Sequence, residues 1–319
     1  MKTNTTASTT SDVLRTSDQE EKYERLLQDA LKRGKQLALK KADPDRPGLQ
    51  NLLENGDEFM DKVVDAVIAA TQGLCVSDEF ANEEVASTRT YPRTFHGLHQ
   101  IKEQIVDLAK KLGLDPKDAL AYAENVLPGL KLANPREGSV AIMSLAGLEK
   151  LVPDQADFGW RFVKGVELLI AKNNEVHPKG MYNWRSGEMD PKHLRMNARI
   201  KAAFEKLAET QKGDILIVPA AQLGMLHRGR SVRRARKAQV ANEFGLGCIG
   251  CLSVTLTHTE RLSDSSELDM DTGDDFSPDA GGDFSKSPHV YFNGDEAKFD
   301  ARDVSDAHDF FGLASGFLP

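Results

Sequence analysis

The sequence has only three cysteines in 319 residues. Three cysteines cannot form a disulfide framework, and so few of them suit a reducing compartment. Long apolar runs are also missing, because stretches such as VVDAVIAA and CIGCLSV fall far short of the roughly 18 residues that a membrane-spanning helix needs. The N-terminal residues lack the apolar segment of a secretory signal. These absences predict a cytoplasmic protein with no membrane partner.

Aromatic residues are scarce as well, with two tryptophans and five tyrosines in the chain. That scarcity argues against a protein that binds single-stranded nucleic acid by stacking bases on aromatic side chains. Hydrophobic residues make up 40% of the chain and charged residues 28%. This composition excludes a wholly disordered chain and is typical of a globular protein with a substantial core.

The net charge of -8 is unevenly distributed. Residues 262–319 contain 14 acidic and 3 basic residues, which leaves the rest of the chain slightly basic. An acidic segment of this kind is typical of solvated loops. It also suits pairing with the basic part of the same chain or with a basic protein partner.

The residue pattern predicts three segments. Residues 1–18 are rich in Ser and Thr and nearly free of apolar residues, so we expect a disordered tail. Residues 19–134 carry apolar residues at three- and four-residue spacing, which predicts a helical part. Residues 135–319 alternate between strand and helix patterns, which predicts an α/β domain that ends in the acidic segment 262–319.

The expected fold class is α/β (or α+β), with a mixed sheet and flanking helices. Residues 214–220 (DILIVPA) form a continuous apolar run typical of a strand buried on both faces. A helix at 232–244 and a second apolar strand at 248–257 would complete a β-loop-α-β unit with parallel strands. Farther along, Asn293-Gly294 predicts a hairpin turn. Asp190 and Pro191 are expected to open a helix.

The string GLGCIG at 245–250 matches G-x-G-x-x-G, the fingerprint of dinucleotide-binding folds. That fingerprint needs a strand before the glycines and a helix after them. The pattern here predicts the reverse order, so we expect no dinucleotide site.

Two other motifs suggest metals. Cys248 and Cys251 form a CxxC pair, but a strand would place them on opposite faces, so we interpret them as buried apolar residues rather than zinc ligands. Asp269 and Asp271 imitate the start of a calcium loop without the spacing of an EF-hand. We interpret the acidic run at 264–283 as a solvated loop, with a site for a hard cation as the alternative, and we predict no metal ligands.

The strongest local chemistry lies at 224–237 (GMLHRGRSVRRARK), which follows the strand at 214–220 and leads into a helix. Ligands of open α/β sheets bind where strands end. Ser231 is expected to cap the helix and to leave backbone N–H groups that attract an anion. The neighbouring guanidinium groups suit a phosphate or a carboxylate. The predicted ligand-binding residues are Arg228, Arg230, Ser231, Arg234 and Arg261. Alternatively, the basic residues pair with the acidic C-terminal segment.

The same region supplies candidate catalytic residues. Parallel strands ending at 220 and 257 would bring His258, Glu260 and Arg261 near His227. Histidine exchanges protons near neutral pH, so His227 or His258 is a candidate acid or base, with Glu260 beside it. The alternative for each histidine is a structural hydrogen bond.

One resemblance extends over the C-terminal half. The stretch GDILIVPAAQLGMLHRGRSVRRARKAQVANEFGLG, with THTERL and the closing GLASGFLP, resembles a group of bacterial proteins that has no assigned activity. A weaker similarity covers VSDEFANEEVASTRTYP at 76–92. The resemblance implies a bacterial or phage-like protein, and it implies no cofactor, substrate or catalytic residue.

Three functions therefore stay open. The leading hypothesis is binding of a phosphorylated or nucleotide-like ligand at the 224–234 loop, with a hydrolase or transferase as its enzymatic form. The second is RNA binding, with the basic helix 228–237 and Lys192, Arg195 and Arg199 on the phosphate backbone. The third is a protein–protein interaction module. The cofactor and the oligomeric state are not determined by the sequence.

Overall fold

The computed structural model describes residues 79–132, 136–265, 268–278 and 282–319, together with isolated helical positions between residues 24 and 63. The chain divides into two compact units, Met1–Gln72 and Gly73–Pro319. The tail expected at 1–18 lies outside the described residues. Sequence patterns suggested a boundary near residue 134, whereas the division falls after Gln72.

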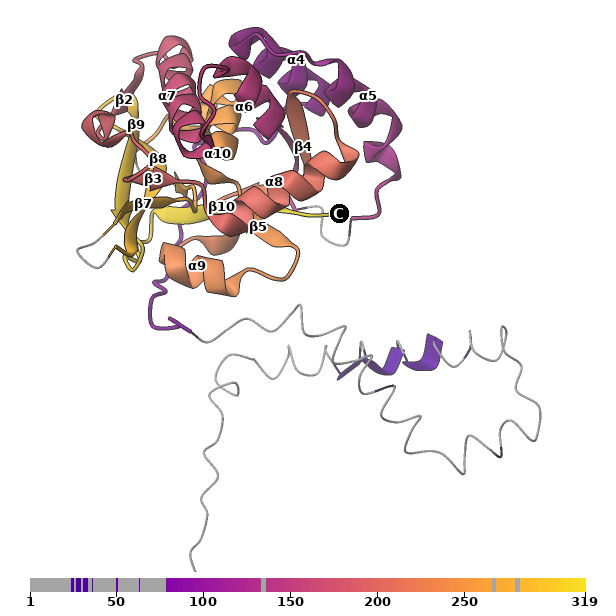
Figure 1. The fold of residues 1–319 in the computed structure, drawn as a ribbon. Helices are drawn as coiled ribbons and strands as arrows, with labels where there is room; N and C mark the ends of the chain where they lie inside the picture. The colour runs from indigo at the N-terminus through magenta and orange to yellow at the C-terminus, as the bar shows by residue number, and fades with distance from the viewer. Residues whose placement is uncertain are drawn as a thin grey trace, which may run out of the picture. The chain divides into compact units, whose positions relative to one another are not determined.

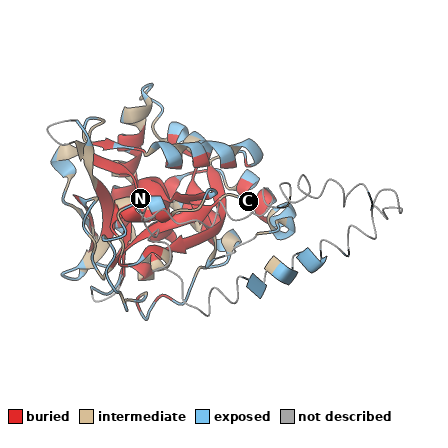
Figure 2. Cartoon of the chain, turned by 90° about the horizontal axis from the view of Figure 1, so that it is seen from below, coloured by how far each residue is buried: buried red, intermediate tan, exposed pale blue. Residues whose placement is uncertain are grey.

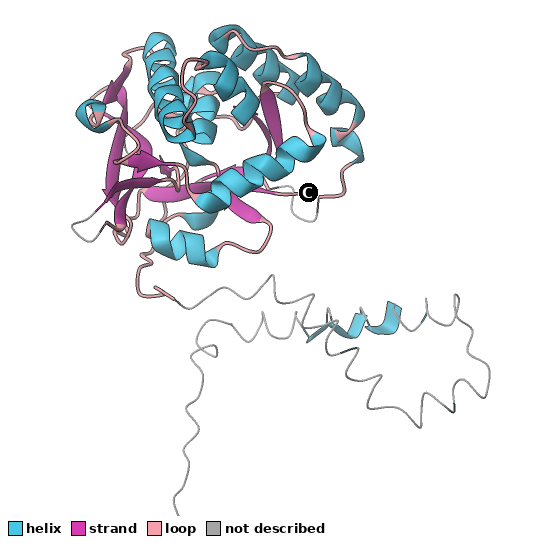
Figure 3. Ribbon diagram, viewed as in Figure 1, coloured by secondary structure: helices cyan, strands magenta, loops and turns pink. Residues whose placement is uncertain are grey.

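The second unit is built on a ten-stranded mixed sheet, which confirms the expected fold class (Figures 1 and 3). Its main path runs through β1 (Gly138–Met143), β4 (Ile215–Leu223), β10 (Phe311–Phe317), β6 (Asp269–Asp271), β8 (Phe284–Asn293), β7 (Asp275–Pro278) and β3 (Leu194–Arg195). Three further strands lie off this path: β5 (Glu243–Gly245) pairs with β10, β9 (Glu296–Asp303) pairs with β8, and β2 (Met181–Asn183) pairs with β9. Among the strands of the described residues, β10 pairs with β6 and β2 pairs with β9 in parallel, and the other pairs are antiparallel.

Helices lie on both sides of these strands. In Figure 1, α4, α6 and α7 lie above β10, and α9 lies below it. The helices are α4 (Ile101–Leu112), α5 (Lys117–Asn125), α6 (Leu145–Leu151), α7 (Phe158–Val176), α8 (Ala198–Thr210), α9 (Val232–Ala238) and α10 (Gly247–Thr257), with short 3-10 turns η2 (Leu127–Gly129), η3 (Ser186–Glu188), η4 (Met225–His227) and η5 (Thr259–Arg261).

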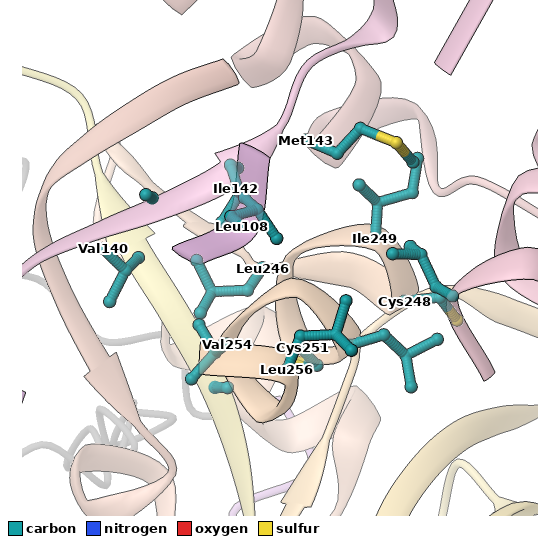
Figure 4. Packing of buried hydrophobic residues seen from close by; sticks show 14 of the residues in the cluster. Leu108, Val140, Ile142, Met143, Leu246, Cys248, Ile249, Cys251, Val254 and Leu256 are labelled. Atoms are coloured by element: carbon teal, nitrogen blue, oxygen red, sulfur yellow. The ribbon is translucent and has the colours of Figure 1, made fainter. Parts of the chain in front are cut away.

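The segment 248–257, which the sequence predicted as a strand, belongs to helix α10. All eleven residues of this helix are buried, so apolar residues occur on every side and no single face repeats along the sequence. A continuous apolar run does not distinguish a buried strand from a buried helix, and here that prediction was wrong. Figure 4 shows Cys248, Ile249 and Cys251 of this helix in one buried cluster with Ile142 and Met143 of β1. Figure 2 shows the same buried centre in red.

The β-loop-α-β unit exists with a different second strand. It consists of β4, η4, α9 and β5, and α9 ends at Ala238 rather than near 244. Strands β4 and β5 are both antiparallel to β10, so they are parallel to each other, with β10 between them. The crossover therefore brings the ends of two parallel strands to one region, although they are not neighbours.

A proline lies inside the central strand β4, which pairs with β1 and with β10. The β1–β4 register shifts between Gly138 and Val140, opposite Pro219. Because proline has no N–H to donate, it is tolerated in a sheet at such an irregularity. The hydroxyl of Ser139 donates to Pro219 O at 3.0 Å, which ties the two strands together there.

Several local predictions are confirmed. Helix α4 ends at Gly113, whose φ of 72° is left-handed, and β8 and β9 are joined by a turn at Gly294 and Asp295.

Helix α8 starts at Ala198, capped by Asn197, so the start expected at Asp190-Pro191 was wrong. There the chain makes turns and the short strand β3. Helices α4 and α5, assigned from the sequence to a separate helical part, share one core with the sheet.

No helix in the described part of the chain has both the length and the apolar character needed to cross a bilayer.

Candidate functional site

The loop between β4 and α9 has the predicted strand–loop–helix order. Ser231 caps α9, because its hydroxyl accepts from Arg234 N at 3.1 Å. Gly224 and Gly229 have φ values of 116° and 77°, the left-handed region that glycine adopts without strain. A Cβ on Gly229 would lie 2.2 Å from Val85 O, so the loop is held against the segment that contains Val85.

That neighbouring segment already occupies the loop. The N–H of Ser231 donates to Glu83 O at 3.0 Å, and its hydroxyl donates to Glu83 Oε2 at 2.7 Å. The N–H of Arg233 donates to Val304 O. The donors expected to bind an external anion are thus bound by the chain itself. Helix α9 has seven residues.

The residues 79–84, which we call the acidic strap, pair with the basic residues of the loop and α9. Glu83 binds Arg233 through both carboxylate oxygens, and Glu84 binds Arg230 and Arg234. Glu79 lies 2.7 Å from Lys237 Nζ. The hydrogen bonds from Arg233 and Ser231 hold the pKa of Glu83 below its usual value, the Arg233 bond having the largest effect. The basic residues therefore pair mainly with the strap.

The predicted pairing with the acidic C-terminal segment is found for one residue of α9. Arg236 Nη2 contacts Asp275 Oδ1 at 2.7 Å, and it also donates to Gly273 O and Asp274 O. The strap was missed because its partners lie about 150 residues away in the sequence. Its only sequence signal is the group of three glutamates at 79, 83 and 84.

His227, a predicted catalytic residue, is only 1% exposed. Its Nδ1 lies 3.0 Å from Arg230 Nη1, and its Nε2 lies 2.8 Å from Glu243 Oε1. A guanidinium only donates, so Nδ1 accepts and Nε2 donates to the carboxylate. Burial alone would raise the pKa of Glu243, but hydrogen bonds from His227 and Ser315 hold it below its usual value. In this network His227 has the structural role that the sequence left as its alternative.

His258 and Glu260 contact His99. His99 N donates to His258 Nε2 at 2.9 Å, the two rings stack at 4.3 Å, and His99 Nε2 lies 3.1 Å from Glu260 Oε1. Burial, and secondarily the neighbouring imidazole of His99, lowers the pKa of His258 to about 4, so it is neutral near pH 7. Glu260 also lines a cavity of about 400 Å³.

Arg261 reaches the end of β4. It is fully buried, donates to Leu223 O at 2.8 Å and to Leu268 O at 2.6 Å, and lies over the ring of Tyr91 at 4.4 Å. The sequence placed this guanidinium near the end of the 214–220 strand, and the contact with Leu223 agrees with that. Its partners are backbone carbonyls of its own chain.

Arg228, the exposed residue of the predicted loop, donates to Arg89 O at 2.9 Å. The predicted ligand-binding residues thus separate into the exposed Arg228, three residues tied to the strap (Arg230, Ser231 and Arg234) and the buried Arg261.

The glycines of GLGCIG follow strand β5 and open helix α10, so the expected order of elements was wrong. Gly247 N donates to Thr272 O at 2.9 Å, and Cys248 N donates to Asp274 Oδ2 at 2.6 Å. A carboxylate of the chain itself thus occupies the start of α10, where the fingerprint would place a pyrophosphate.

The two cysteines of the CxxC pair lie one turn apart on α10, not on opposite faces of a strand. Both are buried, and burial raises the pKa of each thiol, so both are held in the protonated, unreactive form. Among the described residues, no group of three His, Cys, Asp or Glu side chains is arranged to hold a metal ion.

Four aspartates of the acidic run at 264–283 are buried, which the expected solvated loop does not account for. They are Asp269, Asp271, Asp274 and Asp275, and Asp271 makes a two-pronged ion pair with Arg302 at 2.9 and 2.6 Å. The sequence could not show this, because Arg302 comes from the distant strand β9.

The feature that sequence reasoning missed is a cavity of about 310 Å³ beside α9. We call it the cationic pocket. Its charged lining residues, among those described, are all basic: Arg199, Arg236 and Lys237. The remaining lining residues are Asn197, Ile200, Gln239, Gly245, Gly273 and Leu313.

Backbone carbonyls fix Arg199, whereas Arg236 contacts the Asp275 carboxylate as well as two carbonyls, and Lys237 pairs with Glu79. Arg199 Nε donates to Glu243 O at 2.8 Å and Nη2 donates to Val240 O. Burial lowers the pKa of Arg199 below its ordinary value, and the nearby Glu243 charge opposes that shift. Because its hydrogen-bond partners are carbonyls, its charge is not cancelled by an ion pair. Of the three basic side chains, Arg199 is thus the one that offers an anion a fixed guanidinium not paired with a carboxylate.

No family model matches the chain, and neither a curated protein nor a solved structure shows detectable similarity to it.

Proposed function

We propose that the protein binds a small phosphorylated ligand in the cationic pocket. The observation that carries the proposal is the Arg199 guanidinium, which is held by backbone carbonyls rather than by a carboxylate, in a lining whose three charged residues are all basic. The amide of Gln239, whose nitrogen has no hydrogen-bond partner among the described residues, adds a donor for a second polar group of the ligand. This keeps the class of ligand expected from the sequence and moves it from the 224–234 loop, before α9, to the C-terminal end of that helix.

The size of the pocket limits the ligand. A volume of about 310 Å³ is at the lower end of the range of roughly 300–1,000 Å³ found for small-molecule sites. It suits a phosphate with one small organic group, such as a nucleoside monophosphate or a sugar phosphate, better than a dinucleotide.

Binding is favoured over catalysis at this pocket. Acid–base chemistry needs a group that exchanges a proton near neutral pH, and the described lining contains neither a carboxylate nor a histidine. His227, His258 and Glu260 lie in other contacts.

RNA binding by the 228–237 segment gains less support. Of its six basic residues, Arg230, Arg233, Arg234, Arg236 and Lys237 each contact a carboxylate of the chain. An RNA backbone would have to displace the acidic strap, and each lost ion pair would offset part of the gain from phosphate contacts.

The test is calorimetric titration with pyrophosphate, AMP and glucose 6-phosphate, supported by thermal melting. We expect Arg199→Gln to weaken binding about ten- to a hundredfold, because hydrogen bonds to charged groups contribute roughly 1.5–3 kcal/mol. Arg228→Gln is the matched control, since it removes one arginine from the predicted loop and none from the pocket.

Two results would overturn the proposal. If none of the three anions binds the wild-type protein, the pocket is not a phosphate site. If Arg228→Gln removes binding and a folded Arg199→Gln variant keeps it, the ligand lies at the loop instead.

A further inference from the structure

A second cavity, of about 400 Å³, lies where the end of α7, turn η5 and the β8–β9 hairpin meet. We call it the Glu260 cavity. Its walls include apolar side chains of Pro178, Leu262, Phe292 and Ala297. Two hydroxyls, of Thr94 and Ser263, lie 2.6 Å apart at its edge. Walls of this kind suit a compact apolar body with a polar group at one end.

The charge of the Glu260 cavity is opposite to that of the cationic pocket. Its lining has three carboxylates and one ammonium group. Asp295 pairs with Lys179 at 2.7 Å, and Glu296 lies 3.5 Å from Lys298. Glu260 has instead the imidazole of His99, 3.1 Å from its Oε1. It is thus the one carboxylate of the described lining whose ion-pair partner is not a lysine.

His177 completes one wall without adding charge. It is 5% exposed, and neither ring nitrogen has a hydrogen-bond partner. Burial, with help from the charge of Lys111, lowers its pKa to about 4, although the nearby backbone of Thr255 opposes the shift. At neutral pH this wall therefore does not repel a cation.

These features select one class of occupant. A neutral or anionic molecule that covered Glu260 would strip water from a carboxylate without replacing it by a cation, which is costly. A metal ion prefers several oxygen ligands, and the other two carboxylates of the lining are already paired with lysines. A protonated amine supplies both the charge and the N–H donors, and its apolar body would lie on the walls.

We propose that the Glu260 cavity binds a small organic cation, a protonated primary amine carried on an apolar ring, with Glu260 as its counter-ion. The site is independent of the cationic pocket, with which it shares no lining residue.

The probe for this site is phenethylamine, followed by ligand-observed NMR and calorimetry on the full chain. Its neutral analogue 2-phenylethanol and its anionic analogue phenylacetate have the same ring without the positive charge. We expect phenethylamine to bind at least about tenfold more tightly than either analogue. Glu260→Gln should remove that preference and leave the weak binding of the alcohol unchanged.

Two further variants keep the test decisive. Glu103→Gln makes the same change of net charge on the exposed face of α4 and should leave amine binding unchanged. Ser263→Phe places a ring at the exposed edge of the cavity and should weaken both amine and alcohol. It locates the site even if Glu260→Gln fails to fold.

The proposal is overturned if phenethylamine does not bind, or if the alcohol binds equally well. It is also overturned if a folded Glu260→Gln variant binds the amine like the wild type, or if Ser263→Phe leaves amine binding unchanged. Binding of AMP in the same variants reports separately on the cationic pocket.

Discussion

At the scale of single residues, the acidic C-terminal segment contains a buried ion pair between Asp271 and Arg302. Asp271 is fully buried, and its carboxylate holds the guanidinium of Arg302, which is 8% exposed. Removing one member of a buried pair leaves the other charged and without compensation, which typically costs about 3–5 kcal/mol. We therefore expect Asp271→Asn to destabilise the protein by about that amount in urea unfolding.

The matched control for this pair replaces both members. Asp271→Leu with Arg302→Met removes both charges and keeps apolar volume, so it should cost less than Asp271→Asn alone. Equal or greater destabilisation by the double variant would show that packing around Arg302, including its contact with the Phe311 ring at 4.1 Å, matters more than the charge.

Asp274 predicts an unusual pH dependence. Burial raises its pKa to about 6, although the N–H groups of Cys248 and Asn197 favour the charged form. The folded state therefore binds this proton more tightly than the unfolded state, so the contribution of Asp274 to stability is greatest near pH 4. That contribution is lost as the pH rises through 6. The pKa of Asp274 is about two units higher in the folded state than in the unfolded state, and this difference corresponds to about 3 kcal/mol of unfolding free energy.

The measurement compares Asp274→Asn with the wild type in urea unfolding at pH 4, 5, 6 and 7. Because asparagine does not titrate, the variant should gain stability relative to the wild type by up to about 3 kcal/mol over this range. Parallel pH profiles of the two proteins would contradict the assigned pKa.

At the scale of elements, the acidic strap fastens the loop before α9. Val85 N donates to Gly229 O at 2.8 Å, and Ser231 N donates to Glu83 O. The side chain of Glu83 is 11% exposed and binds Arg233 and Ser231. We expect Glu83→Gln to cost about 1–2 kcal/mol, more than an exposed surface pair. Amide hydrogen exchange at Val85 and Ser231 should become faster.

Glu205→Gln provides the control for the strap, because Glu205 makes an exposed pair with Lys201 one helical turn away. Its loss should cost only about 0.3–0.5 kcal/mol. If the two variants have the same small effect and exchange at Val85 is unchanged, the strap does not hold the loop.

The ends of helices and the turns were predictable from the sequence where residues adjacent in the chain determine them. Gly113 ends α4, and the Asn293-Gly294 signal marks the β8–β9 hairpin, whose turn residues are Gly294 and Asp295, because each feature needs only its neighbours in the chain. Helix α10 was not predictable, since burial on all sides removes the periodic apolar face that marks a helix. That error also reversed the order of elements assigned to GLGCIG.

The candidate sites were less predictable than the elements, because they join distant parts of the chain. The cationic pocket combines Arg199 at the start of α8 with Arg236 and Lys237 on α9. The basic character of α9 was evident in the sequence, but the glutamates at 79, 83 and 84 that pair with much of it are about 150 residues away. The sequence shows that these basic and acidic residues are present, but only the fold shows which of them form ion pairs with each other.

At the scale of the whole molecule, the core lies within the second unit. The clustered apolar residues of the described chain, from Phe95 in the loop before α4 to Ala314 in β10, belong to Gly73–Pro319. A unit that contains its own core is expected to fold alone.

We predict that a chain starting at Gly73 unfolds in one cooperative transition, with a Tm within about 5 °C of the full chain. It should also bind AMP and phenethylamine with unchanged affinity, since both cavities are lined by residues of this unit. Differential scanning calorimetry and the two titrations check this. A broad, non-cooperative transition would show that residues 1–72 contribute to the core, whereas a normal Tm with lost binding of either probe would show that they contribute to that site.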